Sequence, residues 1–179
     1  MATAVGGVDR GARFVTTVTG WGLAATAFVY LMTLPPMLNP VDESLILYGA
    51  KRVLLGQAVY RDFFEFLTPG SFYLYGLAFA VGGISITTAR VVTALLNAST
   101  VACVYFLTLR VAGWAESVLA ALLVVTLCVP VWNMASHHWI GTALVAATAA
   151  VLLAPRWQAS TRARPAAAGA LAGALVCTH

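Results

Sequence analysis

Long uncharged runs are the feature that most limits how this sequence can fold. A helix needs about 20 residues to cross a hydrocarbon core of roughly 30 Å, and several stretches approach or exceed that length without a charged residue. Because these runs lack the period-2 alternation of barrel strands, they indicate membrane-spanning helices. The predicted spans are residues 14–34, 91–109, 117–132, 139–155 and 165–179, the last one incomplete.

The composition supports the same class of protein. Charged residues make up 9% of the chain and hydrophobic residues 61%, whereas a soluble domain has roughly 25% charged residues. The first run exceeds the apolar core of a signal peptide, which is about 7–15 residues, so we interpret it as a membrane anchor. We therefore expect an all-α, polytopic helical membrane protein in which residues 1–179 form one truncated module.

The acidic residues are concentrated in one window. Four of the six fall between residues 39 and 70, in NPVDESLILYGAKRVLLGQAVYRDFFEFLTPG. They are Asp42, Glu43, Asp62 and Glu65.

The side of the membrane that this window faces follows from the basic residues, because Lys and Arg accumulate in cytoplasmic loops near span ends. With residues 37–89 as one external loop, six basic residues lie inside: Arg10, Arg13, Arg110, Arg156, Arg162 and Arg164. Four then lie outside: Lys51, Arg52, Arg61 and Arg90. This arrangement predicts a cytoplasmic N-terminus and an extracytoplasmic acidic loop.

An alternative topology remains open because residues 71–83 are also apolar. The unbroken apolar core of this segment is ten residues long, which is typical of an interfacial or re-entrant segment. If it did cross, inverting the whole chain would place seven basic residues inside and three outside. The flanks of the first span favour the external loop.

Residues 42–56 have the pattern of a helix lying on the membrane surface. On a helical wheel, Ile46, Ala50 and Val53 share one side, and Tyr48 and Lys51 share the other. Asp42 stands where an N-cap residue is expected, and Gly56 where a helix commonly stops. The simplest interpretation is that Asp42 only caps this helix and that Glu43 is solvated.

Several blocks occur in a characteristic order. They are DE at 42–43, YGAKRVLLGQAVYRDF at 48–63, TPGSFYLYGLAF at 68–79 and GISITTARVVTALLNASTVACVYFLTLR at 83–110. In this order the chain resembles the GT-C superfamily of membrane glycosyltransferases. The likeness is to the branch that contains protein O-mannosyltransferases, the lipid A aminoarabinose transferase and RgtA/B/C/D-like enzymes.

The resemblance implies an inverting glycosyltransferase that uses a sugar on a polyprenyl phosphate and lies in the inner membrane of a bacterium. By position, Asp42 matches the general base, and Glu43 is its catalytic neighbour. Arg90 matches a basic residue at the outer end of the second span, where it would contact phosphate or anchor the loop. The chemistry suits these residues, since a carboxylate can take the acceptor's proton and cations stabilise a departing phosphate.

The other basic residues of the loop, Lys51, Arg52 and Arg61, are further candidates for phosphate contact. Long basic side chains near headgroups also serve as lipid anchors, so both interpretations stay open for each of them.

The sequence departs from the family in the next external loop, NMASHHW, where many relatives carry a second acidic residue. His137 and His138 are therefore candidates for substrate or phosphate contact, or else interfacial residues beside Trp139. Adjacent helical residues point in different directions, so we predict no metal site, and no cofactor is expected.

The expected partners are the lipid-linked donor, membrane lipids and a lipid, glycan or protein acceptor. No nucleic acid is expected, because the basic residues form no patch with interleaved aromatics. Two other classes remain as alternatives, a fragment of a transporter and a non-catalytic membrane subunit. The predicted spans contain no Asp, Glu, Lys or Arg, which disfavours the transporter. A chain that stops inside a span is expected to be inactive alone.

Overall fold

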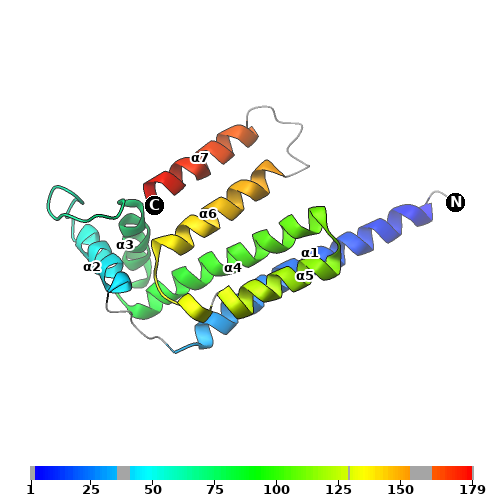
Figure 1. The fold of residues 1–179 in the computed structure, drawn as a ribbon, viewed down its shortest axis with the longest axis horizontal. Helices are drawn as coiled ribbons and strands as arrows, with labels where there is room; N and C mark the ends of the chain where they lie inside the picture. Colours follow the sequence, from blue (N-terminus) through cyan, green and yellow to red (C-terminus); the bar gives the residue numbers. More distant parts are fainter. Residues whose placement is uncertain (1–2, 36–40, 129, 154–162, 179) are drawn as a thin grey trace.

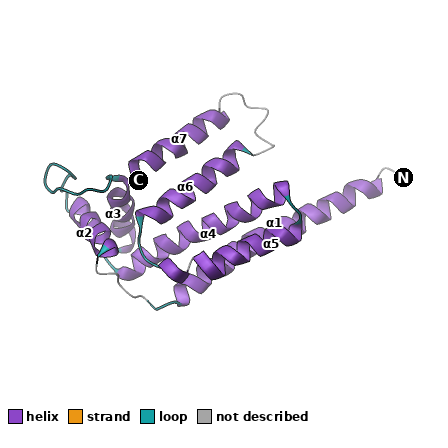
Figure 2. Cartoon of the chain, viewed as in Figure 1, coloured by secondary structure: helices purple, strands orange, loops and turns teal. Residues whose placement is uncertain are grey.

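The chain is described by a computed structural model over residues 3–35, 41–128, 130–153 and 163–178, and helices dominate this part (Figures 1 and 2). The α-helices are α1 (Thr3–Thr33), α2 (Asp42–Leu54), α3 (Gly70–Gly82), α4 (Ile86–Val111), α5 (Trp114–Leu123), α6 (His137–Leu152) and α7 (Ala163–Thr178). No β-strand occurs among the described residues, where Val59 and Phe63 form an isolated bridge. The prediction of an all-α chain is confirmed.

Four of the predicted spans correspond to α1, α4, α6 and α7, although the boundaries differ. The span at 91–109 is part of the longer α4, and the span at 139–155 corresponds to α6. Some predicted features lie outside the described residues. They are loop residues 37–40, the span end at 154–155, Arg156, Arg162 and His179.

Helices α1, α4, α5, α6 and α7 lie roughly along one direction, and α2 and α3 sit together at one end of them (Figure 1). Helix α4 is central, since it contacts α1, α3, α5 and α6. The starts of α4 and α6 and the end of α7 lie at the α2–α3 end, whereas the turn between α4 and α5 lies at the other. The predicted loop therefore forms a small helical layer across one end of the bundle.

Helix α2 begins one residue earlier than the sequence predicts. Val41 occupies the N-cap position and makes no side-chain cap hydrogen bond, so Asp42 is the first helical residue and not the cap. Asp42 and Glu43 still lie in the first turn, where the helix dipole favours carboxylates. The predicted stop is confirmed, because Gly56 has φ +85° and the Gly56 and Gln57 amides donate to Val53 and Arg52, as in a Schellman motif.

The apolar face of α2 is covered by protein. Ile46 and Ala50 are buried in one cluster with Phe72 and Tyr75 of α3. Gly49 allows the close approach, since a Cβ there would lie 2.6 Å from Cδ1 of Phe72. The helical wheel identified the buried face correctly but assigned it to the membrane surface, because a wheel cannot distinguish lipid from a neighbouring helix.

Helix α3 is the segment whose crossing the sequence left open. Its 13 residues span about 20 Å at 1.5 Å per residue, which is less than a hydrocarbon core of roughly 30 Å. Gly83, with φ +79°, ends α3. Ser85 then caps α4 by accepting a hydrogen bond from the Thr88 amide at 3.1 Å.

The predicted span at 117–132 is not one continuous α-helix. After α5, residues Val124–Cys128 form a π-helical turn, and Pro130–Trp132 form a 3-10 turn. Pro130 has no amide hydrogen to continue the helical ladder. The chain leaves this region through a loop that reaches α6, where Ser136 is the N-cap and accepts from the His138 amide.

Two helical segments, Gly11–Thr33 and Ile86–Val111, are long and apolar enough to cross a membrane. The described parts of α3, α6 and α7, and the stretch Trp114–Cys128, are shorter apolar helices.

Candidate functional site

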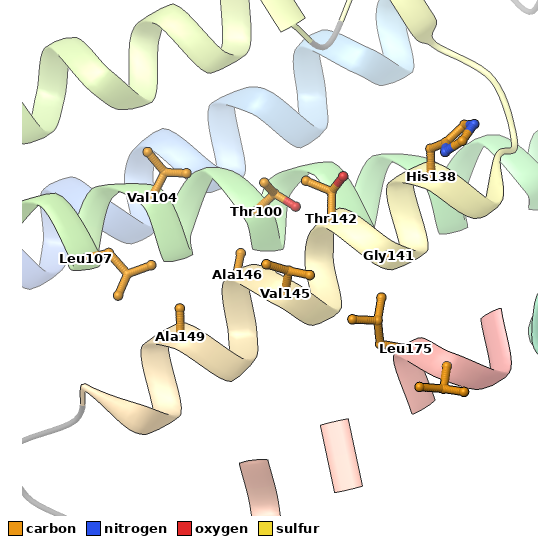
Figure 3. A pocket seen from close by; sticks show the side chains of 11 residues that line it. Thr100, Val104, Leu107, His138, Gly141, Thr142, Val145, Ala146, Ala149 and Leu175 are labelled. Carbon is orange, nitrogen blue, oxygen red and sulfur yellow. The ribbon is translucent and has the colours of Figure 1, made fainter. Parts of the chain in front are cut away.

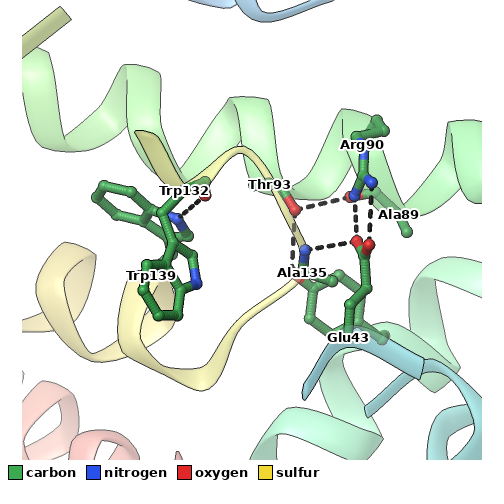
Figure 4. A network of polar contacts seen from close by, with 8 residues as sticks. Glu43, Ala89, Arg90, Thr93, Trp132, Ala135 and Trp139 are labelled. Atoms are coloured by element: carbon green, nitrogen blue, oxygen red, sulfur yellow. Dashed lines mark hydrogen bonds and ion pairs between the residues drawn. The ribbon is translucent and has the colours of Figure 1, made fainter. Parts of the chain in front are cut away.

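The two neighbouring carboxylates of α2 have opposite surroundings. The Glu43 side chain is fully buried and bonds to the guanidinium of Arg90, which is 5% exposed (Figure 4). One of the two hydrogen bonds runs from Arg90 Nη2 to Glu43 Oε2 at 3.0 Å, and the other joins Nη1 to Oε1. Such a two-point pair is strong and directional.

The same carboxylate also holds the loop before α6. The backbone amide of Ala135 donates to Glu43 Oε1 at 2.7 Å, and Ala135 is itself fully buried. Glu43 therefore joins three parts of the chain: α2, the start of α4 and the connection from α5 to α6. Since it is closed off from solvent, we assign Glu43 to positioning and not to catalysis.

Arg90 has a structural role for the same reason. Of the two roles considered from the sequence, loop anchoring agrees with its contacts, and a direct contact with phosphate does not agree with its burial. The solvated Glu43 of the simplest interpretation is likewise wrong. A buried charge needs a partner, and here each residue supplies it to the other.

A neutral hydrogen bond lies beside this pair. The Tyr75 hydroxyl of α3 is 3.2 Å from Thr93 Oγ1 of α4, and the Thr93 hydroxyl donates to the Ala89 carbonyl at 3.0 Å. Because the one hydrogen of the Thr93 hydroxyl points to Ala89, the Tyr75 hydroxyl is the donor to Thr93. Burial raises the pKa of Tyr75 to about 12, which keeps this donor protonated. This bond ties α3 to α4.

Asp42 faces outward into a hollow of about 150 Å³. We call it the Asp42 hollow, and it is lined by Val41, Asp42, Leu45, Phe66, Leu67, Ser136, His137 and His138. The structure thus brings together three of the candidates predicted from the sequence, Asp42, His137 and His138, although 95 residues separate the first two. The exposed carboxylate and two imidazoles share a small cavity with apolar walls.

The two histidines lie closer together than their helical positions suggested. Their ring centroids are 3.9 Å apart with an angle of 40° between the planes. They are the first two residues of α6. Among the described residues, no group of three or more His, Cys, Asp or Glu side chains is arranged to hold a metal ion.

The remaining basic candidates are not in the Asp42 hollow. Lys51 and Arg52 lie near the other end of α2, about 14 Å along the helix from Asp42 at 1.5 Å per residue. They line a separate hollow of about 330 Å³ with Tyr48, Leu55 and Gln57.

Arg52 and Asp62 instead organise the loop between α2 and α3. The Arg52 guanidinium lies 4.2 Å from the centre of the Phe63 ring and donates to the Asp62 carbonyl at 3.1 Å. The Asp62 carboxylate accepts from Arg61 and, at 2.7 Å, from the Ala58 amide. The hydrogen bond from Arg61, followed by that from Ala58, lowers the pKa of Asp62 to about 2. Arg61 is exposed and paired with Asp62.

Sequence reasoning missed several residues that shape the site. Ser136 is buried and lines the Asp42 hollow, and its signal was a hydroxyl shortly before the predicted span at 139–155. Ala135 contributes only its amide, which no side-chain pattern reveals. The Trp139 indole donates to the Trp132 carbonyl at 2.7 Å and holds the turn before α6 (Figure 4).

No protein-family model, curated protein or solved structure matches the chain. The likeness to GT-C enzymes therefore remains a prediction carried by the sequence blocks.

Proposed function

We propose that the chain is part of an integral membrane glycosyltransferase in which Asp42 is the general base. The donor is a sugar on a polyprenyl phosphate, and the acceptor is a hydroxyl group on the extracytoplasmic side. The observation that carries this proposal is the placement of Asp42. It is the exposed carboxylate of a hollow that also contains two imidazoles, and a buried ion pair fixes the helix on which it lies.

Membrane insertion is supported by the exposure of the apolar helices. Only 22% of the most apolar segment of α1 is buried within the chain, and Phe14, Val18 and Trp21 are more than half exposed. An apolar surface of this kind is unfavourable in water. The charge rule assigns the basic ends of α1 and α4 to the cytoplasmic side. These ends, which carry Arg13 and Arg110, lie at the end of the bundle away from α2 and α3.

The proposed reaction is a single displacement. The acceptor oxygen bonds to the anomeric carbon as the bond from that carbon to the phosphate oxygen breaks, and the electron pair leaves with the polyprenyl phosphate. The acceptor proton passes to the Asp42 carboxylate. His137 and His138 donate N–H hydrogen bonds to the departing phosphate. Lys51 and Arg52 line a separate hollow near the other end of α2, too far from Asp42 to make this contact.

Substitution of Asp42 tests the proposal. Asp42→Asn keeps the shape of the side chain but cannot accept a proton, so transfer of labelled sugar from polyprenyl phosphate should fall by about 10²–10⁴-fold. The assay uses membranes containing the protein as the cell makes it, with protein amount and thermal unfolding matched to the wild type.

The matched control is Glu116→Gln, which removes a carboxylate from the first turn of α5, and it should leave transfer unchanged. Wild-type transfer by a folded Asp42→Asn protein would refute the catalytic assignment. Loss of transfer in both variants would show that the assay reports general damage.

A further inference from the structure

A second, larger hollow adjoins the Asp42 hollow. It runs between α4, α6 and α7, has a volume of about 680 Å³ and is lined mainly by aliphatic side chains (Figure 3). We call it the α6 groove. Its walls include Val104 of α4, Ala146 and Ala149 of α6 and Leu175 of α7, and among the described residues that line it His138 is the ionisable one.

Helix α6 contributes three small residues to the groove beside Thr142 and Val145. Gly141, Ala146 and Ala149 line it, so α6 leaves room opposite the larger side chains of α4 (Figure 3). The Thr100 hydroxyl, which also lines it, donates to the Leu96 carbonyl of its own helix at 3.0 Å. That wall therefore offers a methyl group and a satisfied hydroxyl, which suits a hydrocarbon and not a sugar.

His138 connects the groove to the proposed reaction site. It lines the α6 groove, the Asp42 hollow and a third hollow with Trp132 and Trp139. The groove is mainly apolar, with Thr100 and Thr142 in its walls, and at one end it reaches the His138 imidazole and then the Asp42 hollow. From His138 to Ala149 it follows α6 for 11 residues, or about 16 Å at 1.5 Å per residue.

We propose that the α6 groove holds the first isoprene units of the polyprenyl phosphate, with the phosphate at His138. This inference rests on the proposed function for the identity of the lipid, and it adds where the lipid lies. A single-chain amphiphile fits a mainly apolar groove with a hydrogen-bond donor at one end. Its phosphate at His138 is then continuous with the hollow in which Asp42 meets the acceptor.

The experiment uses farnesyl phosphate with a photoreactive diazirine on its terminal isoprene, added to membranes that contain the full chain. Cross-linked peptides are identified by mass spectrometry. Labelling is expected on α6 and α7 within the groove. Ala146→Leu, which fills the groove, should reduce it several-fold, whereas Ala172→Leu, at an exposed alanine of α7 outside the groove, should not.

Competition identifies the occupant. Unlabelled farnesyl phosphate should compete better than farnesol, and His138→Ala should remove this difference. Equal competition by dioleoyl phosphatidic acid would overturn the proposal, because the groove would then be a general lipid site. Equal labelling of the Ala146→Leu and wild-type proteins would overturn it as well.

Asp42→Asn separates this inference from the proposed function, since Asp42 does not line the groove. Labelling that persists in Asp42→Asn while transfer is lost would support both proposals. Groove labelling by a wild-type protein that transfers no sugar would support the lipid site alone. Asp42-dependent transfer with labelling elsewhere would overturn the groove alone.

Discussion

Glu43 and Arg90 are joined by two hydrogen bonds across 47 residues of sequence, and both side chains are buried. This pair turns a charged surface loop into a fixed part of the bundle. Asp42, one residue earlier, is left at the surface by the same arrangement.

Arg90→Met should lower the free energy of unfolding by about 3–5 kcal/mol, because it leaves the Glu43 carboxylate buried without its cation. Glu43→Gln should also destabilise the protein, and the double variant should lose less than the sum of the two single losses. Denaturant titration in detergent micelles measures all three. Additive losses would mean that the pair does not act as a unit.

Gly49→Ala should lower the free energy of unfolding by about 1–3 kcal/mol, which is typical of overpacking. A Cβ at Gly49 would lie 2.6 Å from the Phe72 ring, so α2 and α3 would have to separate. Gly22→Ala is the control, since a Cβ there meets nothing within 4 Å, and helix propensity favours alanine by up to about 1 kcal/mol. Equal effects of both variants would argue against close packing of α2 on α3.

The Asp62 loop should open at low pH. Because the folded pKa of about 2 lies below the ordinary value of 3.8, the stabilising contribution is present above pH 3.8 and is lost as pH falls toward 2. Pepsin cleavage near Phe63, normalised to a free peptide of residues 57–67, should rise across this window. Asp62→Asn should be cleaved readily already at pH 4. Cleavage that does not change between pH 4 and 2 would contradict the role of Asp62.

The orientation of the bundle can be tested with paired cysteines in a chain whose Cys103, Cys128 and Cys177 are replaced by serine. Gln57→Cys lies in the exposed loop after α2, and Ala112→Cys lies in the exposed turn after α4. A membrane-impermeant maleimide should label only Gln57→Cys in intact cells and both after permeabilisation. The reverse pattern would invert the topology, and labelling of both in intact cells would show that α4 does not cross.

The helices were largely predictable because hydropathy and stop signals are local. The uncharged runs predicted α1, α4, α6 and α7, and Gly56 predicted the end of α2 through its backbone freedom. Which of Asp42 and Glu43 is exposed could not be predicted from the local sequence. Adjacent helical residues point about 100° apart, and which of them is buried depends on Arg90 and on the Ala135 amide, 92 residues after Glu43.

The cavity residues show the same limit. His137 and His138 were candidates by residue type, but their sharing of a hollow with Asp42 depends on the path of the chain from α5 to α6. The π-helical turn at Val124–Cys128 also escaped prediction, since its apolar residues are equally compatible with an α-helix. Hydropathy cannot detect this change in helical hydrogen bonding.

The bond from the Ala135 amide to Glu43 also sets an order of assembly. A ribosome makes Glu43 long before Ala135, and proteins mature from the N-terminus during synthesis. The hydrogen bond from the Ala135 amide to Glu43 can therefore form only after α5 and the turn that follows it have been made. The hollow around Asp42 becomes complete only at that late step, so partly synthesised chains do not yet present it.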